Sequence, residues 1–407
     1  MKESLKRNFS KGLNEVLFQI LRLRALRKKY IKSNYVYVIR FAHIGDFCLW
    51  LDSAKEFKKI FPKHKIVFLT YKYKNVKKIA ETTGYFDKVI CFDTEGLKRI
   101  RTIQKACHLK GDIVINSNPS RSLLSDLFVL AIRTNKRIAQ KSDFSEMGKK
   151  QLSRSDLIYD KVIECDLKQM ELIKNAEFIR GLGEKEFKAR LPQLPKIPCN
   201  VKLPKGKYAI IFPDADAPIQ MWNYKNFSIV IQNMLNESID ECLILGSVKY
   251  RNVGDQIVKE LECKMLAEDK KLNHRCINRM GETSLEECIE LVRYASIVLS
   301  NDTGGAHIAA ACNTPCVVLA AGWNRGRFFP YKVEEKRIGE CMPVDIVSAQ
   351  PCLGCGIENI NRFNPECGIN GVPKCIAMNG TEEIIKKIKE GLKKEYEDKR
   401  KNSKDKK

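Results

Sequence analysis

Short apolar strands alternate with helical segments along most of this chain of 407 residues. In the first half, β-branched and aromatic residues dominate the expected strands 35–41, 66–70, 88–92 and 112–116. Strands separated by helices of this length are typical of βαβ units, whose strands pair into parallel sheets. The alternation therefore predicts an α/β protein built on a parallel sheet.

A second series of the same kind begins near residue 207. Its expected strands are 208–212, 242–246, 297–300 and 316–319. The stretch between the two series, residues 191–206, is rich in proline and is interpreted as a linker. We therefore expect two Rossmann-like domains, residues 35–190 and 207–385, with a ligand in the cleft where the carboxyl ends of their strands face each other.

Positive charge gathers at the two ends of the chain, whose formal net charge is +24. In residues 1–34, an apolar stripe at helical spacing lies among many Lys and Arg residues. Such a segment is either a peripheral anchor on an anionic membrane or a helix packed on the protein body with its charges solvated. Residues 386–407 have the composition of a disordered, basic, solubilising tail.

Apolar runs in this sequence are shorter than the roughly 20 residues of a membrane span, and Arg22 and Arg24 interrupt the N-terminal one. We expect a cytoplasmic protein, peripheral to the inner face of the cytoplasmic membrane. Of the sixteen cysteines, all but four lie in otherwise apolar segments. Those have the pattern of small buried side chains in a reducing compartment.

The remaining four cysteines form a group of their own within a Cys-rich loop, residues 341–375. They are Cys352, Cys355, Cys367 and Cys375, in a stretch rich in Gly, Pro and Asn. This spacing suits a structural four-thiolate zinc site, in which the metal organises a loop that lacks a core of its own. Free thiols and disulfides are the two alternatives for the group.

The segment 298–311 passes from an apolar strand through Asp302, Thr303, Gly304 and Gly305 directly into a helix. Paired glycines let the backbone approach a ligand closely, and the first N–H groups of a helix point at bound anions because they have no intrahelical partner. The segment therefore predicts a seat for phosphate in a diphosphate-bearing substrate. A plain helix N-cap is the simpler interpretation, but two adjacent glycines exceed what a cap requires.

Four stretches of this chain, among them residues 245–247 (Leu-Gly-Ser), together resemble one enzyme family. Residues 40–46 (Arg-Phe-Ala-His-Ile-Gly-Asp) are similar to the first strand and Gly-Asp turn of the ADP-heptose:lipopolysaccharide heptosyltransferases, glycosyltransferase family 9. Residues 301–311 resemble the second-domain signature of that family, and residues 222–227 resemble one of its helix starts. The resemblance implies a GT-B fold, in which two Rossmann-like domains face each other across a cleft.

The same resemblance implies an inverting transfer of a heptose-like sugar from a nucleotide-diphosphate donor, expected to be ADP-heptose. The expected acceptor is a lipopolysaccharide-core or related lipid-linked saccharide, bound by the N-terminal domain. Asp46 is the candidate base for the acceptor hydroxyl. Capping of a helix that starts at Phe47 is the structural alternative for Asp46. His43, Gly45 and Arg121 are assigned to the acceptor side.

On the donor side, the resemblance assigns Asp302 to the sugar hydroxyls and the turn after it to the diphosphate. The further donor-side residues are Thr303, Gly304, Gly305, His307, Trp222 and Gly246. For Trp222, packing in the core is the alternative to a place beside the nucleotide. Helix termini and basic side chains can stabilise the leaving diphosphate, so no metal cofactor is expected for catalysis.

Two other functions fit parts of the sequence. A nucleotide-sugar epimerase shares the two-domain layout and would consume donor without any acceptor. The net charge alone would suit a nucleic-acid-binding protein, but the basic residues cluster at the chain ends without interleaved aromatic platforms, so no nucleic-acid partner is expected. The absence of a Walker A loop and of a Gly-x-Gly-x-x-Gly turn disfavours the usual nucleotide-binding classes.

Overall fold

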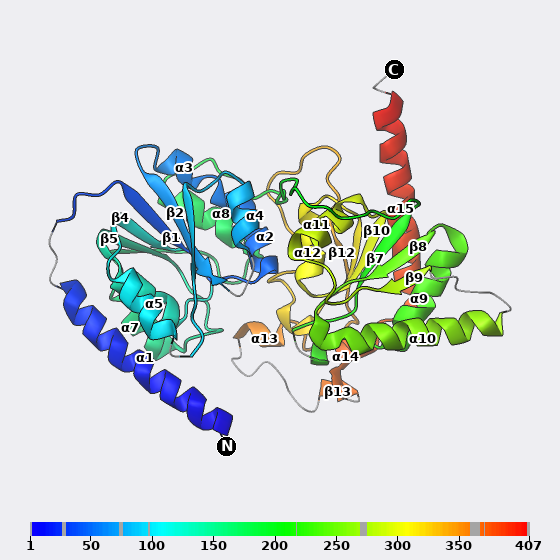
Figure 1. Ribbon diagram of the computed structural model, residues 1–407, viewed down its shortest axis with the longest axis horizontal. Helices are drawn as coiled ribbons and strands as arrows, with labels where there is room; N and C mark the ends of the chain where they lie inside the picture. The colour runs from blue at the N-terminus through cyan, green and yellow to red at the C-terminus, as the bar shows by residue number, and fades with distance from the viewer. Residues whose placement is uncertain are drawn as a thin grey trace. The chain divides into compact units, whose positions relative to one another are not determined.

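The computed structural model describes residues 2–26, 30–72, 76–96, 98–216, 218–268, 275–358, 367–369 and 371–404, with backbone only at 2–11, 357–358, 369 and 394–404. Outside the described residues lie 1 and 27–29 of the basic extension, 73–75, 97, 217, 269–274, 359–366 and 370 of the Cys-rich loop, and 405–407 of the tail. The chain divides into two compact units, Met1–Ala189 and Arg190–Lys407. Each unit is an α/β body of its own (Figure 1).

The first unit is built on a six-stranded sheet in the order β3-β2-β1-β4-β5-β6, and every pair in it is parallel. Its strands are β1 (Tyr35–Ile39), β2 (Lys65–Tyr71), β3 (Lys88–Phe92), β4 (Lys110–Asn116), β5 (Arg133–Gln140) and β6 (Lys161–Ile163). Because β1 is central and covered on both faces, four of its five residues are buried, as its run of valines and isoleucine predicts.

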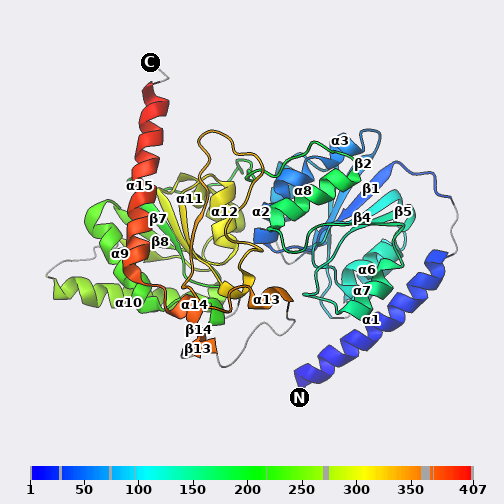
Figure 2. The same ribbon diagram turned by 180° about the vertical axis from the view of Figure 1, so that it is seen from behind.

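Helices cover both faces of this sheet. They are α1 (Lys2–Leu26), α2 (Ile44–Ala54), α3 (Phe57–Ile60), α4 (Lys77–Thr82), α5 (Lys98–Ala106), α6 (Leu123–Ala131), α7 (Lys149–Asp156) and α8 (Glu171–Leu182). One side carries α1, α5, α6 and α7, and the other carries α2, α3, α4 and α8 (Figures 1 and 2). The carboxyl ends of β1 and β4 therefore lie between the two layers of helices.

The polar strand β5 was not among the strands expected from the sequence. Its residues, Arg-Thr-Asn-Lys-Arg-Ile-Ala-Gln, carry no apolar alternation in their first half. Tertiary hydrogen bonds replace that signal: Thr134 Oγ1 donates to the Asp112 carbonyl at 2.9 Å, and Asn135 Nδ2 donates to Asp112 Oδ1 at 2.8 Å. The partner strand β4 thus supplies the acceptors that make a polar strand stable here.

The second unit has a six-stranded parallel sheet in the order β12-β11-β10-β7-β8-β9. Its strands are β7 (Tyr208–Phe212), β8 (Glu241–Ile244), β9 (Cys276–Asn278), β10 (Ile297–Asn301), β11 (Cys316–Leu319) and β12 (Val344–Ile346). A separate two-stranded piece joins β13 (Gly368–Ile369) and β14 (Val372–Pro373). The strand order reverses beside β7 and β10, and this is where such sheets bind ligands.

The longer helices of the second unit are α9 (Tyr224–Glu237), α10 (Arg251–Ala267), α11 (Leu285–Tyr294), α12 (Gly304–Ala311) and α15 (Thr381–Lys404). The short ones are α13 (Cys355–Glu358), α14 (Lys374–Ala377), η2 (Pro218–Gln220), η3 (Val248–Tyr250) and η4 (Gly322–Asn324). Residues of α9, α10 and α15 share one apolar core with the sheet, and α11 and α12 belong to the other layer. The tail predicted to be disordered begins inside α15, which extends to Lys404.

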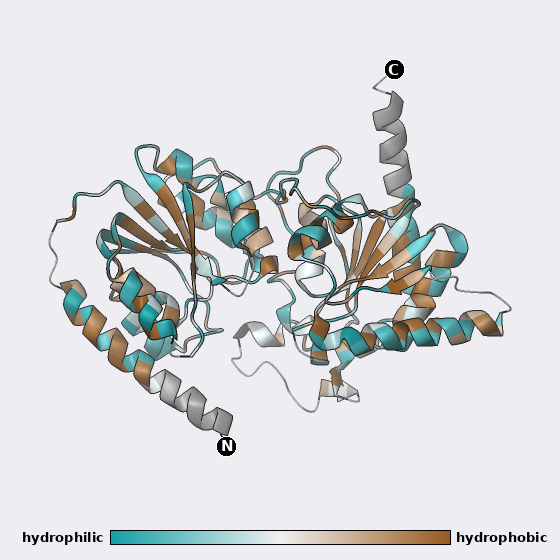
Figure 3. Ribbon diagram, viewed as in Figure 1, coloured by the Kyte–Doolittle hydropathy of each residue, from teal (hydrophilic) through white to brown (hydrophobic). Residues whose placement is uncertain are grey.

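Helix α1 packs on the first unit through one face and exposes apolar residues on another. Phe18 and Leu21 are buried in a core that includes residues of α6. Ile20 and Leu23 are 56% and 66% exposed, and Leu26 is 70% exposed. Figure 3 shows the hydrophobic residues along this helix. Packing on the protein body therefore accounts for only part of its apolar stripe.

The proline-rich stretch predicted as a linker packs against the second unit, whose first residue is Arg190. Leu194 and Ile197 are buried, and the Leu194 N–H donates to the Ala311 carbonyl at 2.8 Å. The Ile197 N–H donates to Glu290 Oε1 at 3.1 Å. Among the described residues, no helix combines the length and the apolar character that a membrane span needs.

Candidate active site

Arg40 fixes the turn that follows the central strand of the first unit. It comes directly after β1 and is 1% exposed. Its Nη1 donates to the Ser117 carbonyl at 2.6 Å and to Asn175 Oδ1 at 3.1 Å, and its Nη2 donates to the Asp46 carbonyl at 3.4 Å. One guanidinium thus ties β1 and the loop after β4 to α2 and α8. The sequence analysis did not identify this role of Arg40. The signal for it is a charged residue directly after an apolar strand.

Asp46, the candidate base, is the third residue of α2. The helix begins at Ile44 with His43 as its N-cap residue, and no side chain caps it. The structural alternative, in which Asp46 caps a helix that starts at Phe47, is therefore wrong. Asp46 is half-buried, and among the residues that the structure describes its carboxylate has no hydrogen bond or ion pair. Such a carboxylate can accept a proton from a ligand.

His43 and Gly45 lie in the same turn as Asp46. His43 is exposed and Gly45 is buried, and the His43 carbonyl accepts the Phe47 N–H at 2.9 Å, which closes the first turn of α2. The structure therefore brings His43, Gly45 and Asp46 together at the carboxyl end of β1. Contact of the first two with an acceptor stays a prediction.

Arg121, also predicted for the acceptor side, lies inside the first unit and is 1% exposed. Its Nη1 donates to Ser155 Oγ at 3.0 Å, and its Nη2 pairs with the Asp156 carboxylate. The guanidinium also lies 5.0 Å from the centre of the Tyr159 ring. These contacts hold the Arg121 guanidinium inside the first unit. Binding of acceptor by Arg121 stays an untested prediction.

Asp302 follows β10 in the second unit and opens the turn before α12. Its Oδ2 accepts the Ala321 N–H at 3.2 Å, which ties the turn to the loop after β11. Burial raises the pKa of Asp302 to about 7, against the lowering effect of the Ala321 hydrogen bond and with a further rise from Asp345. The charge of Asp302 therefore changes near neutral pH, within reach of any ligand at this turn.

The backbone of this turn is arranged to receive an anion. Thr303 is the N-cap residue of α12, and its Oγ1 accepts the Gly305 N–H at 3.3 Å. Within the described part of the chain, the N–H groups of Thr303 and Gly304 have no protein acceptor. Unpaired amides at a helix N-terminus bind phosphate groups readily. Of the turn predicted to bind phosphate, the groups left to donate to a phosphate are therefore the backbone N–H groups of Thr303 and Gly304.

Gly305, the second glycine of the turn, has a packing role. A Cβ atom added to it would lie 2.4 Å from Cδ2 of Phe212, the last residue of β7. The sequence interpretation attributed both glycines to ligand approach, but close packing of α12 on β7 is enough to require Gly305. The ligand argument therefore depends on Gly304.

Asp214, two residues after β7, is a candidate that sequence reasoning missed. Its Oδ2 accepts the Ser247 N–H at 2.6 Å, and burial raises its pKa. Gly246 has a φ of 152°, and a Cβ there would lie 2.6 Å from Asp214 Oδ1. Because β8, β7 and β10 are neighbours in the sheet, Gly246, Asp214 and Asp302 share one edge. An acid just after a buried apolar strand was the available signal.

His307 and Trp222, both predicted for the donor side, are buried among aromatic side chains. His307 Nδ1 bonds with the Tyr331 hydroxyl at 2.6 Å, and its ring stacks on Phe329 with centroids 5.1 Å apart. Trp222 packs edge-on against Phe227 at 5.2 Å within the core of the unit. The structure therefore supports the alternative for Trp222, packing in the core. Phosphate contact by His307 stays a prediction.

The four cysteines of the predicted zinc site come close enough to affect one another. Burial raises the pKa of the Cys375 thiol, and the nearby thiols of Cys367, Cys352 and Cys355 raise it further. Cys352, Cys355, Cys367 and Cys375 are free thiols in the structure. In the described ranges, no three or more His, Cys, Asp or Glu side chains are arranged to hold a metal ion. Zinc at these thiols stays a prediction.

The sequence matches the model of glycosyltransferase family 9 (heptosyltransferase) over residues 99–344, which is more than half of the chain. The chain therefore belongs to this family, as the resemblance of its sequence motifs predicts. Both the donor-side turn and the strands around it fall inside the match. Membership of a transferase family does not favour the epimerase or the nucleic-acid-binding alternative.

Among curated proteins, lipooligosaccharide heptosyltransferase 2 of Haemophilus influenzae is 29% identical over 102 residues. That alignment covers 25% of this chain and 27% of the relative, so only about a quarter of each protein is compared. It supports kinship within the family and leaves the substrates of this chain to be proposed.

Solved structures of the family share the fold. The E. coli ADP-heptose lipopolysaccharide heptosyltransferase II aligns with a TM-score of 0.63 at 15% identity, covering 89% of this chain and 99% of that one. The E. coli heptosyltransferase WaaC with ADP aligns with a TM-score of 0.60 at 14% identity, covering 88% and 99%. The predicted class, α/β of GT-B type with two Rossmann-like domains, is confirmed.

Proposed function

We propose that this protein transfers a heptose from ADP-heptose to a saccharide of the lipopolysaccharide core or a related lipid-linked acceptor. The observation that carries the proposal is the family match together with the amides of Thr303 and Gly304, which stand unpaired before α12. The name of the curated relative specifies heptose transfer, and the solved relatives are described with ADP or ADP-heptose.

On the donor side, the diphosphate binds at the start of α12. The Thr303 and Gly304 amides donate to its oxygens, and the helix dipole favours its negative charge. Asp302, when ionised, accepts hydrogen bonds from sugar hydroxyls. As the bond between the anomeric carbon and the diphosphate oxygen breaks, its electron pair stays on ADP, and these same donors stabilise the growing charge.

On the acceptor side, Asp46 is the base. The acceptor hydroxyl oxygen attacks the anomeric carbon from the face opposite the leaving diphosphate, so the configuration inverts, and the hydroxyl proton passes to the Asp46 carboxylate. Arg40 is a positioning residue, because it holds the Asp46 carbonyl from within the unit.

The exposed apolar residues of α1 provide a contact for a membrane that carries the acceptor. Val16, Ile20, Leu23 and Leu26 are more than half exposed, and Arg22 and Arg24 are half-buried among them. Apolar side chains enter the interface while basic side chains attract anionic lipid, at about 1 kcal/mol per basic residue. We place the protein at the inner face of the cytoplasmic membrane on this ground.

The group Cys352, Cys355, Cys367 and Cys375 is proposed to bind one structural zinc ion. Four thiolates are a suitable donor set, and mutual interaction of the thiols supports their convergence. Zinc would organise the loop, and catalysis would proceed without it.

A single incubation tests the proposed function. The full chain is mixed with ADP-heptose, with and without a lipopolysaccharide-core acceptor, and products are followed by mass spectrometry. The proposal predicts ADP release and an acceptor heavier by one heptose only when both substrates are present. Donor consumption without acceptor would instead indicate an epimerase. Absence of any reaction with ADP-heptose, while another nucleotide sugar is turned over, would overturn the donor assignment.

A further inference from the structure

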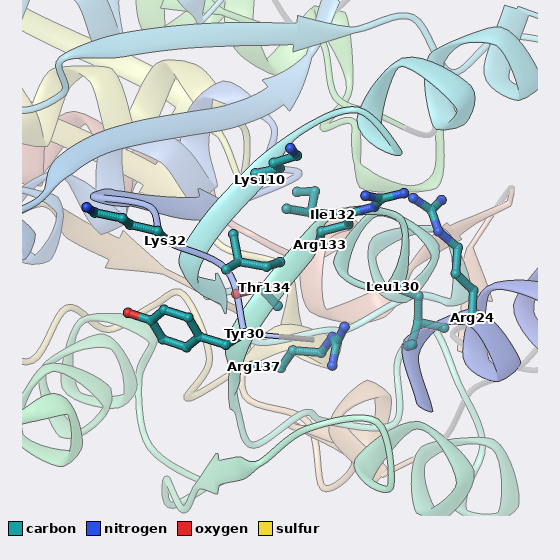
Figure 4. Close-up of a pocket in the computed structure, with 11 residues that line it drawn as sticks. Arg24, Tyr30, Lys32, Lys110, Leu130, Ile132, Arg133, Thr134 and Arg137 are labelled. Atoms are coloured by element: carbon teal, nitrogen blue, oxygen red, sulfur yellow. The ribbon is translucent and has the colours of Figure 1, made fainter. Parts of the chain in front are cut away.

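The first unit carries a strongly basic cavity that the proposed reaction does not use. It has a volume of about 530 Å³, within the range of small-ligand pockets, and eleven residues line it (Figure 4). Five of them are basic and none is acidic: Arg24, Lys32, Lys110, Arg133 and Arg137. The remaining lining is formed by Tyr30, Thr134 and apolar residues.

The cavity lies away from the Asp46 turn within the unit. Lys110 is the first residue of β4 and Arg133 is the first residue of β5, so the cavity opens at the amino end of these parallel strands. The Asp46 turn follows the carboxyl end of β1. The two sites therefore lie at opposite edges of the same sheet, and the cavity is not an extension of the candidate active site.

Arg137 is the feature that most clearly points to a ligand. It is 5% exposed, and burial lowers its pKa. Its Nε has no hydrogen-bond partner, and no ion pair or hydrogen bond of its guanidinium is found with the described residues. A buried guanidinium that makes no hydrogen bond is costly, and the charge of the nearby Asp160 offsets the effect of burial on the pKa of Arg137 only in part. The nearby Asp160 carboxylate accepts the backbone N–H of Arg137 at 2.8 Å.

Two further guanidinium groups, those of Arg24 and Arg133, line the cavity. In Figure 4 the side chains of Arg24 and Arg133 point toward each other. Arg24 comes from α1, where its Nη2 donates to the Cys107 carbonyl at 3.0 Å, and Arg133 comes from β5. Like charges held together repel, and an anion placed between them would remove that repulsion.

The wall formed by residues 30–32 is fixed to β5. The Ile31 N–H donates to Asn135 Oδ1 at 2.9 Å, and Asn135 Nδ2 donates back to the Ile31 carbonyl at 2.9 Å. The second Nδ2 hydrogen of Asn135 bonds Asp112 Oδ1, and His64 Nε2 bonds Asp112 Oδ2 at 2.9 Å. The cavity is thus built by side chains that are already ordered, and Asp112 is already engaged by these partners.

We propose that this cavity is a binding site for a phosphate-bearing anion, held by the guanidiniums of Arg137, Arg133 and Arg24. Planar guanidiniums match phosphate oxygens in charge and in geometry. The phosphate belongs either to a lipid headgroup or to a small free molecule. The cavity borders α1, whose exposed apolar residues would accompany a headgroup.

The site is tested with glycerol 3-phosphate and inorganic phosphate as probes, by calorimetric titration of the full chain. We expect saturable binding to the wild type, weakened about tenfold or more in Arg137→Met and in Arg133→Gln, which each remove one charge-assisted contact. Arg133 is exposed, so Arg133→Gln keeps the test valid if Arg137→Met fails to fold. Lys136→Gln removes the same charge from the opposite face of β5 and should bind as the wild type does.

Vesicles distinguish the two sources of phosphate. If the natural ligand is a headgroup, phosphatidylglycerol vesicles bind the wild type, Arg133→Gln weakens that binding more than Lys136→Gln does, and glycerol 3-phosphate competes. If the ligand is a free anion, titration with the soluble probes succeeds and vesicle binding is the same in both variants. The proposal is overturned if neither soluble probe saturates, or if Lys136→Gln weakens binding as much as Arg133→Gln. Transfer to a soluble acceptor should be unchanged in Arg133→Gln, so failure of this site is separable from failure of the proposed function.

Discussion

Gly305 at the start of α12 lies so close to Phe212 at the end of β7 that an added Cβ atom would come within 2.4 Å of the ring. The helix that offers its amides to the donor is therefore positioned by direct contact between a glycine and an aromatic ring. This contact links the local sequence to the sheet edge that carries Asp214, Gly246 and Asp302.

The Gly305→Ala variant should be destabilised by about 1–3 kcal/mol, because the new methyl group has to displace the Phe212 ring or the helix. ADP should also bind more weakly, since any shift of α12 moves the Thr303 and Gly304 amides. Thermal unfolding and ADP titration measure the two effects. Gly380→Ala is the matched control, because a Cβ there meets nothing within 4 Å. Equal stability of the two variants would show that α12 is not packed as described.

Asp302 should make stability depend on pH. Its pKa is raised to about 7 in the folded protein from an ordinary 3.8, so the folded state holds the proton more tightly than the unfolded chain. The free energy of unfolding should therefore decrease as pH rises from about 4 through 7. Asp302→Asn should weaken this dependence, since Asp214 with its raised pKa still contributes, and it should raise stability at pH 8 by about 1 kcal/mol or more.

The measurement is chemical denaturation of the variant and the wild type at pH 5 and pH 8, without ligand. Asp216→Asn, at an exposed acid after β7, is the control and should leave the pH dependence of the wild type intact. A pH dependence in Asp302→Asn as steep as that of the wild type would assign it to another group.

Arg40→Met should destabilise the first unit by about 2–4 kcal/mol, because the Ser117 carbonyl and the Asn175 side chain lose a buried charged donor. As a positioning residue for the Asp46 turn, Arg40 should also affect turnover number more than the KM for donor. Arg101→Met, an exposed arginine on α5, provides the comparison in both assays. If Arg40→Met is as stable as Arg101→Met, Arg40 does not hold the Asp46 turn as described.

Zinc analysis of purified protein should find about one metal ion per chain, with a lower Tm and retained transfer after chelation. Cys375→Ser should lose the metal, and Cys263→Ser, at an exposed thiol outside the group, should keep it. If the purified protein holds no metal and all four thiols of the loop can be alkylated, the proposed zinc site is wrong.

Most of the sheet architecture could be predicted from the sequence, because central parallel strands such as β1 and β7 are continuous apolar runs. Strand β5 could not, since its polar residues are stabilised by hydrogen bonds to Asp112 on β4, which no local pattern records. The same limit applies to the proline-rich stretch, whose apolar side chains are buried against the second unit.

The candidate site was predictable where a turn joins a strand to a helix. Asp302 directly follows β10, whereas Asp46 lies in the first turn of α2, seven residues after β1, and was assigned its role through the family resemblance. The environment of a side chain was not predictable: Arg121 is 1% exposed inside the first unit, and Asp214 is positioned by Ser247 from another strand end. Such contacts join residues more than thirty positions apart, so they appear only once the chain has folded.

The most direct test of the account is the turnover of Asp46→Asn with ADP-heptose and a lipopolysaccharide-core acceptor. Loss of a general base should lower the turnover number by about 10²–10⁴, while ADP-heptose affinity and thermal stability stay close to those of the wild type. Asp52→Asn, six positions further along α2, is the control and should retain transfer in its folded fraction. Turnover by Asp46→Asn within a factor of a few of the wild type would contradict the assignment of Asp46 as the base.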